Sequence, residues 1–337
     1  MIDIEKETLP KLGFLGVGWI GKNRLEALTS EGLTEHISIC DPHQPSVEST
    51  LKAVPSAKVN ENFDELLASD VDGIVIATPS ALHSKQAVQA LAQGKAVFCQ
   101  KPLGRDLNET KAVVHAAQQA DKLLAVDYSY RYTKGIAAVK ELLEQEALGK
   151  IFAVEATFHN AYGPDKAWFY DPGLSGGGCL IDLGSHLVDL LFYLFKAPSI
   201  DVRYANLLAQ GKPLVSRGER VEDFAEAQLK TSTGISIHLA CSWKLSVGKD
   251  AQISLKIYGT EGGVSFHNVN GSFFDFQTDI YTQNNIETIV TPPDDWGGRA
   301  IQHWGRQLAK GNKFNPENYE LIKSAALLEE IYKYTGI

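Results

Sequence analysis

This chain of 337 residues lacks the features that mark secreted or nucleic-acid-binding proteins. Its four cysteines lie far apart, with no C-x-x-C pair and no cysteine–histidine spacing typical of zinc, which argues against a disulfide framework and a zinc-binding module. The 32 lysines and arginines are outnumbered by 41 acidic residues and form no basic cluster. Nucleic acid and anionic membrane surfaces are therefore not expected as partners.

Long apolar runs are scarce as well. The longest, residues 187–195, contains Asp189 and is too short to span a bilayer. Residues 1–7 are charged and lack the apolar core of a signal peptide. We therefore expect a cytoplasmic protein with reduced cysteines and no membrane segment. The length favours about two domains, and the sequence shows no internal repeat or low-complexity segment.

The first part of the chain alternates short apolar runs with amphipathic helical runs. Continuous runs rich in valine and isoleucine, separated by helices, predict a doubly wound parallel sheet that is buried on both faces. The expected strands are residues 13–16, 37–41, 73–78, 96–99 and 123–128. The expected helices are residues 20–30, 63–68, 82–93 and 107–120.

The pattern changes after an expected helix at residues 136–145. Apolar and polar residues now alternate, which predicts a mostly antiparallel sheet with one open face. Its expected strands are residues 151–158, 224–231, 235–243, 251–258 and 264–267, and its expected helices are 179–195, 299–309 and 316–334. We therefore divide the chain into a dinucleotide-binding domain at residues 1–130 and a second domain at residues 131–337.

The strongest motif is G-x-G-x-x-G at Gly16, Gly18 and Gly21, between the first strand and the first helix. Such glycines allow a tight turn, close approach of a pyrophosphate and close packing of helix on strand. The next strand ends at Asp41, whose carboxylate suits the two ribose hydroxyls of an NAD adenosine. No arginine or lysine follows until Lys52, so NAD is expected rather than NADP. The alternative is an ordinary glycine-rich turn.

Two further clusters carry possible chemistry. Gln100, Lys101 and Pro102 follow the strand at residues 96–99, where ligands bind in doubly wound sheets, although most lysines there are simply exposed. Asp182, His186 and Asp189 recur at helical spacing in an otherwise apolar segment. From the residues alone this polar stripe is catalytic, a hydrogen-bonded core network, or a metal site.

Together these motifs resemble the Gfo/Idh/MocA oxidoreductases, which include glucose–fructose oxidoreductase and inositol dehydrogenase. The resemblance rests on G-x-G-x-x-G, a Lys-Pro step near residue 100 and D-x-G-x-H-x-x-D in a central helix. Tyr130-Arg131-Tyr132, Thr78-Pro79 with His83, and residues 258–262 also look like family features. It implies an N-terminal Rossmann domain, an α/β second domain that commonly makes oligomer contacts, and Lys101, Asp182 and His186 as the catalytic group.

The resemblance also implies two sets of binding residues. The expected cofactor contacts are Gly16, Gly18, Trp19, Ile20, Gly21, Asp41, Thr78, Pro79, His83, Gln100 and Lys101. The expected substrate contacts are Lys101, Arg131, His159, Tyr162, Trp168, Asp182 and His186, of which the aromatic residues could equally be core or interface packing. No metal is expected.

The chain departs from the family pattern at Gln100, where the family usually has glutamate, and at Ser129, where it usually has asparagine. Gln100 keeps the shape and hydrogen bonding of glutamate but loses its charge, which puts in doubt any exact transfer of the role of Lys101.

These residues suit hydride transfer between a nicotinamide cofactor and a secondary alcohol or ketone of a sugar, cyclitol or related polyol. His186 would be the general base, Asp182 would orient it or bind a hydroxyl, and Lys101 would stabilise the developing charge. The alternatives are an NAD-dependent glycoside hydrolase and a non-enzymatic NAD-binding sensor. We expect a homodimer or homotetramer built through the open sheet face.

Overall fold

The computed structural model describes residues 9–336, and the charged segment at residues 1–7 lies outside this range. The described chain divides into two compact units. The first holds the residues up to Gly104, Asn108–Asp127 and Gly298–Tyr319; the second holds Arg105–Leu107, Tyr128–Gly297 and the residues from Glu320 onward. Residues 298–319 belong to the first unit, whereas the sequence predicted one uninterrupted second domain from residue 131 onward.

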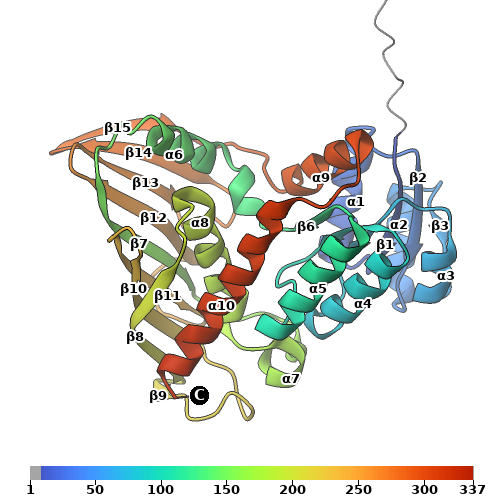
Figure 1. The fold of residues 1–337 in the computed structure, drawn as a ribbon, viewed down its shortest axis with the longest axis horizontal. Coiled ribbons are helices and arrows are strands. Elements are labelled where there is room, and N and C mark those ends of the chain that lie inside the picture. The colour runs from blue at the N-terminus through green and yellow to red at the C-terminus, as the bar shows by residue number, and fades with distance from the viewer. Residues whose placement is uncertain (1–8, 337) are drawn as a thin grey trace, which may run out of the picture. The chain divides into compact units, whose positions relative to one another are not determined.

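The first unit is built on a six-stranded parallel sheet in the order β3-β2-β1-β4-β5-β6 (Figure 1). This order is that of the doubly wound dinucleotide-binding fold, so the predicted architecture is confirmed. Strands β4 and β5 are buried along their whole length, as their uninterrupted apolar sequences require. The strands are β1 (Lys11–Leu15), β2 (His36–Cys40), β3 (Lys58–Val59), β4 (Gly73–Ile76), β5 (Ala96–Cys99) and β6 (Leu124–Val126).

Helices connect these strands. They are α1 (Trp19–Ser30), α2 (Gln44–Ala53), α3 (Phe63–Ala68), α4 (Ser80–Ala92) and α5 (Leu107–Ala120), with α9 (Arg299–Lys310) and the 3₁₀ turn η4 (Pro316–Asn318) added from the C-terminal part. The buried indole of Trp304 attaches α9, with its ring centroid 5.7 Å from that of Phe98 in β5. Helix α2 was not predicted, although its proline lies in the first turn, where the missing N–H has no helical partner.

The second unit is built on a nine-stranded sheet in the order β15-β14-β13-β12-β7-β11-β10-β8-β9. Only the β7–β11 pair is parallel among these neighbours, so the predicted mostly antiparallel sheet is confirmed. The strands are β7 (Ile151–Asn160), β8 (Ile200–Ala209), β9 (Lys212–Pro213), β10 (Phe224–Thr231), β11 (Ser236–Ser242), β12 (Ala251–Gly259), β13 (Gly263–Asn268), β14 (Phe276–Thr282) and β15 (Asn285–Val290).

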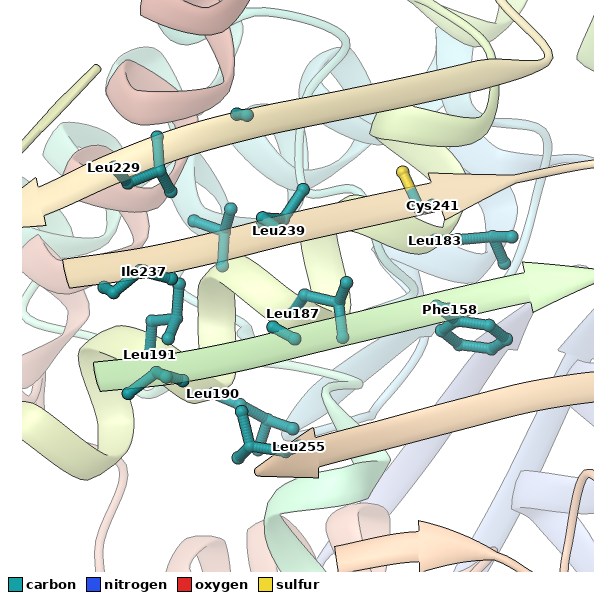
Figure 2. Packing of buried hydrophobic residues seen from close by; sticks show 14 of the residues in the cluster. Phe158, Leu183, Leu187, Leu190, Leu191, Leu229, Ile237, Leu239, Cys241 and Leu255 are labelled. Atoms are coloured by element: carbon teal, nitrogen blue, oxygen red, sulfur yellow. The ribbon is translucent and has the colours of Figure 1, made fainter. Parts of the chain in front are cut away.

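Helices α6 (Lys134–Glu144), α8 (Ser185–Phe195) and α10 (Tyr319–Tyr334) lie along one face of this sheet (Figure 1). Leucines of α8 pack against Ile237 and Leu239 of β11 and Leu255 of β12, and this contact forms the core of the unit (Figure 2). The shorter elements are η1 (Ser129–Tyr132), η2 (Ala167–Tyr170), α7 (Pro172–Ser175) and η3 (Leu180–Gly184).

The segment Pro172–Phe195 is long and apolar enough to cross a membrane by composition alone. However, 78% of its most apolar window is buried within the protein. It includes η3 and α8, and the leucines of these two elements pack against the sheet to form the core. Burial against the sheet therefore accounts for its apolar character.

Candidate active site

The glycine motif forms a tight loop between β1 and α1. Gly16 has a φ of +88°, and a Cβ atom there would lie 2.7 Å from the carbonyl oxygen of Ala77. A Cβ atom on Gly21 would overlap the carbonyl of Gly16, whereas nothing lies within 4 Å of the Cβ position of Gly18. Helix α1 begins at Trp19 with no side-chain cap. The loop therefore presents open space beside uncapped N–H groups, which suits a pyrophosphate.

Asp41 follows β2 directly and lies beside this loop. Its Oδ2 accepts a hydrogen bond from the N–H of Val17, and its Oδ1 accepts one from His43, both at 2.8 Å. The residue is only half-buried, so each carboxylate oxygen keeps a further acceptor position toward solvent. The backbone contacts fix the carboxylate next to the glycine loop, as recognition of a ribose requires.

His83 lies inside the first unit rather than on its surface. Its side chain is buried, with Nδ1 2.7 Å from the carbonyl of Pro102 and Nε2 2.7 Å from that of Thr78. Burial lowers the pKa of His83, although the two carbonyl contacts oppose that shift. His83 thus connects the Thr78-Pro79 turn to the loop after Lys101 and stabilises the conformation of both loops.

Gln100 belongs to a charged network at the carboxyl ends of β5 and β6. Its amide Nε2 donates to Oδ2 of Asp127, and the same oxygen accepts from Nε of Arg24 at 2.6 Å. The Asp127 side chain is fully buried, and that of Arg24 is nearly so. This acid therefore lies in contact with the position where the family usually has glutamate. Because Gln100 is neutral, it can donate to the Asp127 carboxylate, whereas a glutamate at this position would repel that carboxylate.

Asp182 and His186 interrupt an otherwise buried stretch of their helical segment. From Ser175 to Phe192 every residue is buried except these two, which are half-buried. The expected continuous α-helix at residues 179–195 is instead a π-helical turn, η3, that carries Asp182, followed by α8 with His186. π-helical turns within α-helices are frequent at functional sites.

Aromatic rings and an indole N–H surround this pair. The His186 ring lies edge-on to Tyr130, with centroids 5.0 Å apart, and close to Tyr128 and Phe158. Trp243, directly after β11, donates its indole Nε1–H to Oδ2 of Asp182 at 3.1 Å. The imidazole is thus packed among aromatic rings, and the carboxylate is hydrogen-bonded to the indole of Trp243.

Asp189, the third residue of the predicted stripe, does not join them. It is buried and forms a two-point ion pair with Arg131, whose Nε lies 2.7 Å from Oδ2 and whose Nη2 also donates to Oδ1. Burial raises the pKa of Asp189 despite the guanidinium. Arg131 is engaged with this acid and also lies over the Tyr193 ring at 4.9 Å.

The remaining expected substrate residues lie in different places. His159 follows Phe158 on β7, and alternation directs it to the opposite sheet face, where its Nδ1 lies 2.7 Å from Oγ of Ser242. Trp168 stacks on Phe169 at 3.8 Å, and Phe169 contacts Trp243, which holds Asp182. Tyr162 is exposed and contacts Phe273. Of these three, only Trp168 is connected by packing to the Asp182 region.

The structure thus brings Asp182 and His186 together in the second unit and places Lys101 in the first, at the loop after β5. Residues that sequence reasoning missed are Trp243, Asp127 and Arg24. Only Trp243 left a signal, namely an indole at the end of an alternating strand. Among residues 9–336 no group of three or more histidine, cysteine or acidic side chains is arranged to hold a metal.

Comparison with known proteins agrees with this geometry. Residues 11–128 match the oxidoreductase family with an NAD-binding Rossmann fold, and residues 136–265 match the GFO/IDH/MocA C-terminal domain. The chain belongs to the GFO/IDH/MocA oxidoreductase family. The two matches together cover more than half of the chain and meet near the observed division between the units.

Relatives of this family member are sugar and cyclitol dehydrogenases. Glucose-6-phosphate 3-dehydrogenase of Bacillus subtilis is 29% identical over 78% of this chain and 75% of its own length. Inositol 2-dehydrogenase of Rhizobium meliloti is 22% identical over 95% of this chain and 94% of its own.

Solved structures of relatives share the fold. GenD2 from gentamicin A biosynthesis, in complex with NAD, has a TM-score of 0.80 at 26% identity and covers 97% of this chain and 94% of its own. Levoglucosan dehydrogenase with NADH and levoglucosan has a TM-score of 0.83 at 20% identity, with 97% of each chain covered. The cofactor of the family is thus a nicotinamide dinucleotide, as the glycine loop predicts.

Proposed function

We propose that this enzyme transfers a hydride between NAD and a secondary alcohol or ketone of a sugar or cyclitol. The observation that carries the proposal is that Asp182 and His186 alone are half-buried within the otherwise buried residues 175–192. A histidine and an acid that reach solvent from a core helix are available to a substrate hydroxyl, whereas a core network would be closed to it. When bound, the nicotinamide ring supplies or accepts the hydride.

The residues of the chain supply the rest of the reaction. His186 removes the hydroxyl proton at a ring nitrogen during oxidation and returns it during reduction. Asp182, held by Trp243, accepts a hydrogen bond from a neighbouring hydroxyl or from the imidazole. Lys101 donates to the reacting oxygen and stabilises its developing negative charge. We place Trp168, which reaches the Asp182 region through Phe169 and Trp243, at the sugar as an apolar contact.

The cofactor preference follows from Asp41. A 2′-phosphate would approach a carboxylate whose near neighbours in the sequence include no lysine or arginine until Lys52. NAD is therefore preferred over NADP. The half-exposed state of Asp41 and its two backbone contacts support this assignment.

We further infer a homodimer or homotetramer and a cytoplasmic location. The outer face of the nine-stranded sheet is not covered by α6, α8 or α10 and carries half-buried aromatic side chains such as Phe224 and Tyr258 beside polar ones. A partner sheet would cover them. The four cysteines are reduced and buried, which fits a reducing compartment. Sedimentation at micromolar concentration and cell fractionation test the two inferences.

The reaction itself is tested with a panel of sugars, sugar phosphates and inositols plus NAD, followed by NADH absorbance. Formation of one NADH for each alcohol oxidised supports the proposal. Substrate cleavage without NADH accumulation would instead identify a glycoside hydrolase. NADH binding without turnover of any member of the panel would favour a sensor.

A further inference from the structure

A buried acid, Glu222, lies under the start of the helical segment that carries Asp182. The segment begins with three glycines, Gly176–Gly178. A Cβ atom on Gly178 would overlap the Glu222 carbonyl, and one on Gly177 would overlap the hydroxyl of Tyr332. The glycines therefore allow the backbone to lie directly on these two residues.

The Glu222 carboxylate makes an unusual number of contacts through one oxygen. Its Oε1 accepts the N–H of Gly178 and the N–H of Leu180, both at 2.9 Å, and the hydroxyl of Tyr332 at 2.8 Å. Its backbone carbonyl accepts the N–H of Cys179 at 3.0 Å. Glu222 thus satisfies the first N–H groups of the helical segment, as a capping acid does.

This carboxylate is also wholly buried. Its exposed fraction is 0%, and its Oε2 has no hydrogen-bond partner among residues 9–336. Burial raises the pKa of Glu222, although the three donors oppose the shift. Burying such a group is costly, and a well-packed apolar side chain could fill the same volume. What an apolar residue could not supply is the fixed acceptor for Gly178 and Leu180.

Two short hydrogen-bonded routes lead to Asp182, one from the Glu222 carboxylate and one from the backbone of the adjacent Asp223. In the first, the Asp182 N–H donates to the carbonyl of Gly178 at 2.9 Å, so the residue held by Glu222 holds the backbone of Asp182. In the second, the carbonyl of the adjacent Asp223 accepts the N–H of Trp243 at 2.7 Å, and Trp243 donates its indole N–H to the carboxylate. Hydrogen bonds from residues 222–223 therefore reach the backbone of Asp182 through Gly178 and its side chain through Trp243.

We propose that Glu222 is a positioning residue of the reaction, which fixes the position of Asp182 through the backbone of Gly178 and Leu180. This rests on the function proposed above for Asp182. Glu222 is too deeply buried to contact substrate, so it acts only through these neighbours. A displacement of about 1 Å in a catalytic group lowers turnover by about 10²-fold, which sets the expected size of the effect.

Kinetics of three variants test the role. Glu222→Ala removes the acceptor, Glu222→Gln retains an acceptor oxygen, and Glu226→Gln is the control, an outward-facing residue of β10 bonded to Asn206 at 3.3 Å. Per folded enzyme we expect kcat to fall about 10²-fold in Glu222→Ala but only about tenfold in Glu222→Gln. The KM for NAD should be unchanged in both variants. Glu226→Gln should match the parent.

A second measurement needs no substrate and also covers the case in which Glu222→Ala does not fold. The indole N–H signal of Trp243 is one of five in a ¹⁵N NMR spectrum and can be assigned with Trp243→Phe. In folded Glu222→Gln this signal should shift while the other four stay in place. An unmoved signal, or a folded Glu222 variant with parental kcat, would overturn the positioning role. Absence of turnover in the parent enzyme would instead count against the proposed function.

Discussion

Asp182 and Asp189 lie on the same helical segment of the second unit, yet their surroundings are opposite. Asp182 is half-buried and accepts the indole N–H of Trp243. Asp189 is buried and is matched at two points by the guanidinium of Arg131. The difference shows that residue type and helical spacing do not separate a reactive acid from a structural one, whereas solvent access does.

The largest effect is expected at His186, which shares the exposed side of the segment with Asp182. His186→Ala should lower kcat by about 10²–10⁴-fold, because the hydroxyl proton loses its acceptor. The free energy of unfolding should fall by about 1 kcal/mol, since the half-buried ring loses its contacts with Tyr130 and Phe158. Turnover, NADH affinity and denaturant unfolding should be measured on one preparation. Activity that merely follows the folded fraction would favour the structural alternative.

Asp189→Ala should show the reverse pattern. It leaves the Arg131 guanidinium without its acid and should cost about 3–5 kcal/mol of unfolding free energy. The matched control is Asp201→Ala, which breaks an exposed ion pair with Arg203 at 3.0 Å and should cost less than about 1 kcal/mol. Equal losses in the two variants would show that the Asp189 pair is not the stabilising one.

The network around Asp127 extends the comparison to the first unit. Gln100→Glu introduces the residue usual in the family, but it places two carboxylates in contact in a buried network. We expect a loss of about 2 kcal/mol in unfolding free energy. Adding Asp127→Asn should recover most of that loss. If Gln100→Glu is as stable as the parent, Asp127 does not determine the residue at position 100.

A smaller effect is expected at Asp41, a half-exposed acid like Asp182. Asp41→Ser should weaken NAD binding by about 1 kcal/mol, and NADP binding should improve because the repelling charge is removed. Dissociation constants for both cofactors, with parent and variant compared at one ionic strength, provide the measurement. NADP binding as tight as NAD binding in the parent would contradict the assigned preference.

Local patterns in the sequence account for much of the fold. The apolar runs predicted β4 and β5, and the alternation in residues 251–258 predicted β12. Strand β15 escaped prediction because its residues are nearly all exposed and do not alternate. Strand β8 was not predicted because buried and exposed residues do not alternate regularly along it. Its pairing with β10 also shifts register between Gln228 and Leu229. Such strands are defined by their neighbours in the sheet rather than by their own sequences.

For the site, periodicity placed Asp182 and His186 on one helical face but could not show that a π-helical turn carries the first. It also could not separate Asp189 from them, because Arg131 belongs to a distant segment. Trp243 and Glu222 were missed for the same reason, since each reaches Asp182 only through the order of strands in the sheet. The glycine loop was predictable because strand, loop, helix and acid are consecutive in the sequence.

The most direct test of the account compares Asp182→Asn with the parent enzyme, since this change removes the charge and keeps the shape. We predict unchanged NADH affinity, unfolding free energy within about 1 kcal/mol of the parent, and kcat lower by at least about 10²-fold. A folded, NADH-binding Asp182→Asn enzyme with parental turnover would contradict the claim that the half-buried acid of this helical segment takes part in the reaction.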